Sequence, residues 1–184
     1  MSEAQRHRDT AAHFTLLVDG ATDWDAPVPV EGWVARDVVG HLTAWLPEFL
    51  RGAGVEMAPV PADPVEAWHD HVAQVQTILD HPATPGRVLR NPHTGEMPLA
   101  TAIDRIYTTD VFMHTWDLAR ATGQDDTLDP QACAELLAGM TPIEQMLRDS
   151  GQYGPRVAVP ADADPQTQLI SFLGRDPYWT AHRD

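Results

Sequence analysis

Apolar residues recur at helical spacing through most of the chain. The clearest stripe, in residues 33–51, consists of Val34, Val38, Leu42, Trp45 and Phe49. Similar periodicity, together with capping and terminating residues, predicts a series of helices and no extended sheet. The expected helical segments are residues 3–19, 33–51, 63–80, 99–122, 129–149 and 166–173. We therefore expect an all-α fold.

Helix-breaking residues set several of the expected boundaries. Asp63 can cap a helix whose first turn contains Pro64, and Pro130 can occupy the first turn of a later helix. Gly123 is a typical C-terminal cap for the segment before it. Residues 81–98 are rich in turn formers. They allow a short extended stretch near residues 87–91, and the sequence leaves open whether two strands pair there.

Three polar residues fall on helical faces that otherwise read as buried. His41 follows Val34 by seven residues on the same stripe, so its ring is expected to point into the core. Asp110 and His114 are four residues apart and lie one above the other on a helix, where both can bind a single cation. Histidine and aspartate facing inward in a helical core are candidate metal ligands.

Two other interpretations of these residues remain open at this stage. A core histidine is commonly hydrogen-bonded and inert, and an Asp110–His114 pair can be a buried ion pair without a metal. Asp117, one turn after His114, also needs a partner if it is buried. It is a candidate for orienting that histidine. Periodicity alone does not show that His41 approaches the other two residues.

Longer motifs relate the chain to a known family. The segments GWVARDVVGHLTAW, NPHTGEMPLATAIDRIYTTDVFMHTWDLARATG and DPQTQLISFLGRDP span much of the sequence. They resemble the DinB-like metalloprotein superfamily, in particular the branch related to mycothiol-dependent maleylpyruvate isomerase. This resemblance implies a four-helix bundle, here with additional C-terminal helices, that holds a divalent metal through His41, Asp110 and His114. The isomerase-type motif has glutamate where this chain has Asp110, which leaves the identity of the metal more open than metal binding itself.

The resemblance also implies a chemistry. Zinc is the first expectation for the metal, with nickel or iron as alternatives, and three protein ligands leave a coordination position open. Related bundles activate low-molecular-weight thiols, so we expect a metal-dependent thiol transferase or isomerase that acts on a small-molecule substrate with mycothiol as cosubstrate. A hydrolase that uses metal-bound water and a non-catalytic protein that binds a metal or small ligand are the two alternatives.

Length, composition and charge restrict the class of protein. A chain of 184 residues with 43% hydrophobic content suits one domain, with a bundle and fifth helix in residues 1–150 and a C-terminal extension in residues 151–184. No membrane-spanning or signal segment is apparent, so we expect a cytoplasmic monomer or homodimer. The formal charge of -15 argues against nucleic-acid binding.

The remaining reactive residues are weaker candidates. Cys133, the single cysteine, shares helical spacing with apolar residues and is expected in the core. His69 and His71 are expected on a solvated helix surface. Arg175 can either bind an anionic substrate or form a structural ion pair. Trp33, Trp45 and Trp116 are expected to pack the bundle, with Trp45 also able to line a pocket beside the metal. The other histidines, His93 and His182 among them, form no second cluster.

Overall fold

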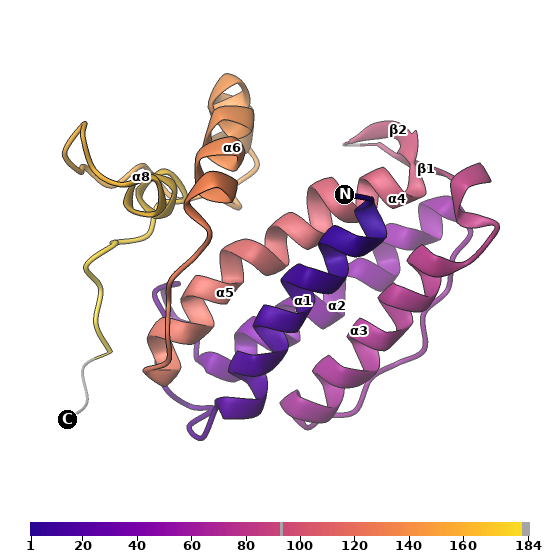
Figure 1. The fold of residues 1–184 in the computed structure, drawn as a ribbon, viewed down its shortest axis with the longest axis horizontal. Coiled ribbons are helices and arrows are strands. Elements are labelled where there is room, and N and C mark those ends of the chain that lie inside the picture. Colours follow the sequence, from indigo (N-terminus) through magenta and orange to yellow (C-terminus); the bar gives the residue numbers. More distant parts are fainter. Residues whose placement is uncertain (93, 182–184) are drawn as a thin grey trace.

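The protein is mainly helical, as the apolar periodicity predicts. A computed structural model describes residues 1–92 and 94–181. Four longer helices lie side by side: α1 contacts α3 and α5, and α2 contacts the same two helices (Figure 1). None of the described helices is long and apolar enough to cross a membrane. The four helices are α1 (Glu3–Gly20), α2 (Ala35–Leu50), α3 (Pro64–Asp80) and α5 (Thr109–Thr122).

Large apolar side chains fill the space between these helices. Phe14 of α1 and Trp68 of α3 are fully buried, with ring centroids 4.4 Å apart. The indole N–H of Trp68 donates to the Thr15 hydroxyl at 2.8 Å, so its polar atom is satisfied inside the core. Leu42 of α2 and Tyr107 are also fully buried. This core fixes the positions of α2 and α5 relative to each other.

The helix that leads into α5 contains a π-helical segment. The short helix α4 (Leu99–Ala102) continues through the π-helical residues Ile103–Thr108 directly into α5. A π turn inserts an extra residue and changes the direction of the side chains that follow, and such turns often lie at functional sites. The predicted end of the helix is confirmed, because Gly123 adopts the left-handed conformation with φ 70°.

The structure contains one small β-hairpin among the described residues, so the fold is mainly helical and not all-α as predicted. Strands β1 (Val88–Asn91) and β2 (Gly95–Pro98) pair antiparallel, with Val88 opposite Pro98. The hairpin contacts the 3-10 turn Arg51–Ala53 that follows α2. The segment of turn formers between α3 and α4 therefore contains two paired strands, which answers the question that the sequence left open.

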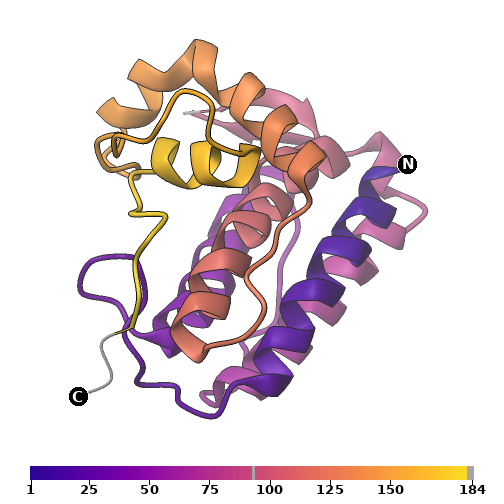
Figure 2. The same cartoon turned by 60° about the vertical axis from the view of Figure 1, so that its left-hand side comes forward.

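The C-terminal helices pack against the outer side of α5 (Figure 2). A second apolar cluster joins Met113 and Trp116 of α5 to Cys133 and Leu169. The prediction of one continuous helix over residues 129–149 is wrong. Pro142 lies in a 3-10 turn that interrupts it, because proline lacks the N–H of a regular helical turn and crowds the preceding one. The observed helices are α6 (Pro130–Met140), α7 (Glu144–Asp149) and α8 (Pro165–Phe172).

Candidate metal centre

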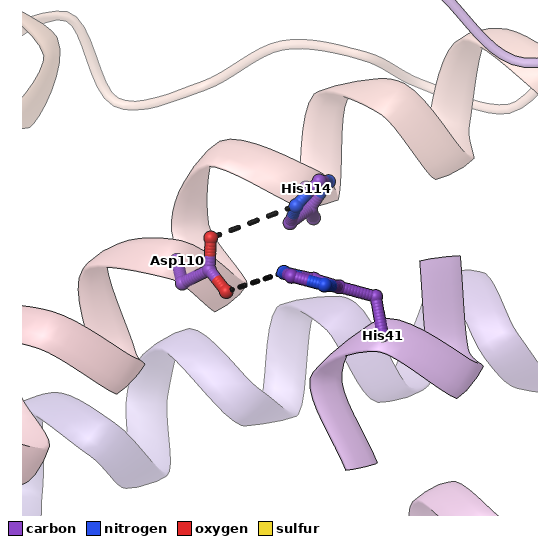
Figure 3. Close-up of side chains that lie close together, drawn as sticks. All are labelled: His41, Asp110 and His114. Atoms are coloured by element: carbon purple, nitrogen blue, oxygen red, sulfur yellow. Dashed lines mark hydrogen bonds and ion pairs between the residues drawn. The ribbon is translucent and has the colours of Figure 1, made fainter. Parts of the chain in front are cut away.

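The structure brings together the three residues selected from the sequence. His41 projects from the middle of α2, while Asp110 and His114 project from successive turns at the start of α5 (Figure 3). One ligand atom from each of the three residues can be chosen so that all lie within 4.8 Å of one another. The Asp110 carboxylate faces both imidazole rings from the same side, with one oxygen directed toward each ring (Figure 3). This group could hold a metal ion.

The spacing of the ligand atoms suits a small divalent ion. His41 Nε2 lies 3.0 Å from Asp110 Oδ2, and His114 Nε2 lies 3.5 Å from Asp110 Oδ1. Nitrogen and oxygen ligands at about 2.0–2.1 Å from a tetrahedral zinc ion are separated from each other by about 3.3 Å. Each histidine is thus within a few tenths of an ångström of this separation from one carboxylate oxygen, although the two distances end on different oxygens of Asp110. The three ligand atoms lie within 4.8 Å of one another, so the side chains would have to move closer together to bind one ion.

Asp110 is held in the charged form that a metal ligand requires. Burial would raise the pKa of Asp110, but the neighbouring His114 and the hydrogen bonds with His41 and Trp45 outweigh it and lower the pKa. The indole N–H of Trp45 donates to Asp110 Oδ2 at 3.1 Å. This bond fixes the carboxylate plane toward α2.

Asp117 determines which nitrogen of His114 faces Asp110. Burial would raise the pKa of Asp117, but the guanidinium of Arg175 and the His114 ring lower it, so Asp117 is a carboxylate. His114 Nδ1 donates a hydrogen bond to Asp117 Oδ2 at 2.8 Å. In the neutral ring, the lone pair on Nε2 then faces the acceptor Oδ1 of Asp110. A divalent ion, or a second proton on the ring, satisfies these two facing acceptors.

Arg175 completes this chain of contacts from the C-terminal part of the protein. Its Nε donates to both oxygens of Asp117 at 2.7 and 3.0 Å, and a second guanidinium nitrogen donates at 2.8 Å. The Asp117 side chain is 0% exposed and that of Arg175 is 13% exposed. Of the two roles considered for Arg175, the structure shows the ion pair. Asp117 has the orienting contact with His114 that the sequence suggested.

Two tryptophans border the site. The sequence predicts packing for both and allows Trp45 also to line a pocket beside the metal. The Trp33 ring stacks on His114 with centroids 5.8 Å apart and an interplanar angle of 15°, and it lies 5.2 Å from the His41 ring. The Trp45 ring lies 6.5 Å from the His41 ring. The His41 side chain is 33% exposed, so solvent reaches the group past this ring. Trp33 is the first residue of the expected helix 33–51, but α2 begins at Ala35, so Trp33 lies before the helix and reaches the two histidine rings from there.

Two further histidines are buried away from this centre. The expectation that His71 lies on a solvated surface is wrong: it is 0% exposed, as is His7 on α1. Burial lowers the pKa of each to about 4. His69, in contrast, is exposed and contacts Asp19 at 2.8 Å. His7 Nε2, both ring nitrogens of His71 and the Tyr107 hydroxyl are buried without a hydrogen-bond partner among the described residues.

The remaining candidates take no part in the site. Cys133 is buried in the second apolar cluster, as predicted, and burial together with two nearby carboxylates raises the pKa of its thiol to about 11. Such a thiol is protonated and unreactive at neutral pH. His93 and His182 lie outside the described residues.

The fold and the site define a mainly helical protein with a His–Asp–His group able to hold a metal ion. Sequence comparison then places the chain among its relatives. It is 31% identical over 177 residues to two proteins of Mycobacterium tuberculosis, from different strains and each named an uncharacterized protein. The match covers 93% of this chain and 94% of each relative, so the chain belongs to the same protein family as these two. No protein-family profile matches the chain, and no solved structure matches it.

Proposed function

We propose that this protein is a metal-dependent enzyme that activates a small thiol, of the mycothiol type, for transfer or isomerisation. The observation that carries the proposal is the convergence of His41, Asp110 and His114 from two helices. We also propose that α1, α2, α3 and the helix containing α4 and α5 form a DinB-like four-helix bundle. In support, one candidate ligand lies on the second of these helices and two lie on the fourth, as the resemblance implies.

The residues suit this role in three ways. Asp110 is ionised and fixed by Trp45, and His114 is oriented by Asp117 so that Nε2 faces the site. His41 is partly exposed, which leaves an approach for a small ligand. A divalent ion held by these three residues would leave a coordination position for a small ligand, and such an ion would lower the pKa of a thiol or water.

The shorter side chain of aspartate is compatible with this arrangement. The related motif has glutamate at the position of Asp110, and aspartate is shorter by one methylene. Asp110 nevertheless lies 3.0 Å from His41 and 3.5 Å from His114, so it reaches both rings from its place at the start of α5. We propose zinc as the ion, because two imidazoles and one carboxylate form a typical donor set of catalytic zinc sites.

Metal analysis tests the first half of the proposal. Protein purified without a chelating tag is stripped with a chelator and titrated calorimetrically with zinc, nickel and iron(II). We expect one equivalent of metal to bind the unmodified chain and His69→Ala, a control in which an exposed histidine is removed. His114→Ala should bind at least about 100-fold more weakly because it loses a ligand. Equal binding by His114→Ala would show that the ion binds elsewhere and that the three residues do not form the metal site.

Thermal unfolding tests the thiol. Mycothiol or a short analogue should raise the melting temperature of the metal-loaded protein and leave the metal-free protein unchanged, because a ligand stabilises the native state to which it binds. His41→Ala should lose this shift. Equal shifts with and without metal would indicate an ordinary pocket. A metal-loaded protein that gives no shift would contradict thiol activation and favour the hydrolase or the binding protein.

A further inference from the structure

An open pocket lies next to the candidate metal centre, at the C-terminal end of α2. It has a volume of about 470 Å³, within the range of small-molecule sites, which is about 300–1,000 Å³. Trp45 and Phe49 provide aromatic surface, with ring centroids 5.6 Å apart. Arg51 from the following 3-10 turn and Arg90 from β1 also line it. Two cations and two aromatic rings are therefore available to one ligand.

Trp45 is a wall shared by this pocket and the metal centre. Its indole N–H donates to Asp110, while its ring packs against Phe49 in the pocket. His41, Trp45 and Phe49 follow each other at intervals of four residues on α2, so they form one stripe along the helix. Successive members are about 6 Å apart along the helix axis. A small ligand in the pocket can therefore extend past Trp45 toward His41.

Two guanidinium groups at the rim can bind an anion, although each also has a glutamate partner. The whole chain has 27 acidic and 12 basic residues, yet two arginines and one glutamate, Glu48, line this pocket. Arg51 pairs with Glu48, with side-chain exposures of 68% and 74%, and Arg90 pairs with Glu96, at 67% and 66%. Ion pairs this exposed contribute little to stability, so both guanidinium groups can turn toward an incoming carboxylate and bind it with paired hydrogen bonds.

Gly52 keeps the two arginines at the same rim. A Cβ atom at this position would lie 2.3 Å from the carbonyl oxygen of Arg90, so the turn after α2 touches the backbone of β1. Any larger residue would push the hairpin away. The close approach holds Arg90 beside Arg51, although they are far apart in sequence.

We propose that this pocket binds a small organic acid, with the apolar body against Trp45 and Phe49 and the carboxylate between Arg51 and Arg90. Binding itself needs no metal. The assignment of the acid as the second substrate, the acceptor of the activated thiol, rests on the proposed function. The stripe from Phe49 to His41 would then place the far end of the acid near the metal centre.

Calorimetry on metal-free protein tests the pocket, because a carboxylate could otherwise coordinate the metal directly. The probes are naphthalene-2-carboxylate and the neutral naphthalene-2-methanol. The acid should bind at least about tenfold more tightly than the alcohol, as expected for hydrogen bonds to a charged group. Arg51→Gln and Arg90→Gln should each weaken the acid by about tenfold and leave the alcohol unchanged.

Arg36→Gln is the matched control. Arg36 lies at the opposite end of α2 and also forms an exposed ion pair, with Asp25, so its loss changes the net charge equally. Equal affinity for acid and alcohol, equal weakening by all three substitutions, or no binding of the acid would overturn the proposal. The same samples are titrated with zinc. Acid binding without zinc binding would contradict the proposed function and support the pocket. Zinc binding without acid binding would contradict the pocket proposal alone.

Discussion

The ion pair between Arg175 and Asp117 should be essential for the stability of the site. Arg175→Met retains much of the side-chain length and removes the guanidinium that donates three hydrogen bonds to Asp117. Asp117 is 0% exposed, so water cannot replace these bonds without structural change. Its described hydrogen-bond partner would then be His114 alone. A buried carboxylate without its counter-charge is strongly destabilising.

The expected cost follows from this burial. Breaking a buried ion pair on one side costs about 3–5 kcal/mol. For a chain of this length, that corresponds to a fall in melting temperature of roughly 6–20 °C. Urea unfolding should show the same loss of free energy. Because His114 also loses its fixed orientation, affinity for zinc should fall by about 10–100-fold.

A second variant and a control make this prediction specific. Adding Asp117→Asn to Arg175→Met should recover part of the stability, because the unpaired charge is gone while an amide oxygen still accepts from His114. Arg8→Met removes a partner of Asp80 in an ion pair about half exposed on both sides, and should cost less than about 1 kcal/mol. Should Arg175→Met cost no more than Arg8→Met, the reasoning about burial would be wrong.

Two further predictions concern buried titratable groups outside the metal centre. Cys133→Ser should leave the zinc content unchanged. The pKa of the Cys133 thiol is raised to about 11, so the thiol should react with a disulfide reagent only after unfolding. Rapid reaction of the native protein would contradict the assignment of Cys133 to the core. Burial lowers the pKa of His7 and His71 to about 4, so the unfolded chain binds protons at these residues first and stability falls as the pH drops from about 6.5 to 4. At pH 5 the free energy of unfolding should be lower by about 2 kcal/mol for each of these histidines. Urea unfolding of His71→Leu should therefore show a smaller loss of stability between pH 7 and pH 5 than the unmodified chain. Identical losses would refute this.

The inward direction of each candidate ligand was predictable from local periodicity, whereas their convergence on one site was implied by the family resemblance alone. Asp110 and His114 share a helical face by their spacing alone, and His41 lies on the apolar stripe of its own helix. The sequence also contained the signal for His71. Trp68, Val75 and Leu79 are buried on α3, and His71 falls on the same stripe at helical spacing. The neighbouring polar residues concealed this pattern.

Contacts that depend on how distant segments dock were not predictable in this way. Arg175 and Asp117 are 58 residues apart, and their contact depends on the packing of α8 against α5 through the second apolar cluster. The hairpin of β1 and β2 is local in sequence, and its strands also contact the turn after α2. The break at Pro142 is different, since proline within a helical segment is a local signal that the apolar periodicity outweighed.

With a divalent ion bound, the charge balance of the centre would favour an anionic ligand at an open coordination position. Asp110 and Asp117 are ionised, and Arg175 offsets one of these charges, so with neutral imidazoles the group carries one net negative charge. A divalent ion would turn this into one net positive charge. A thiolate or hydroxide next to the ion would then neutralise the site. A neutral ligand would leave the net positive charge of this largely buried group uncompensated. This balance depends on Arg175, because without it the same ion would be neutralised by the two carboxylates alone and would attract an anion less strongly.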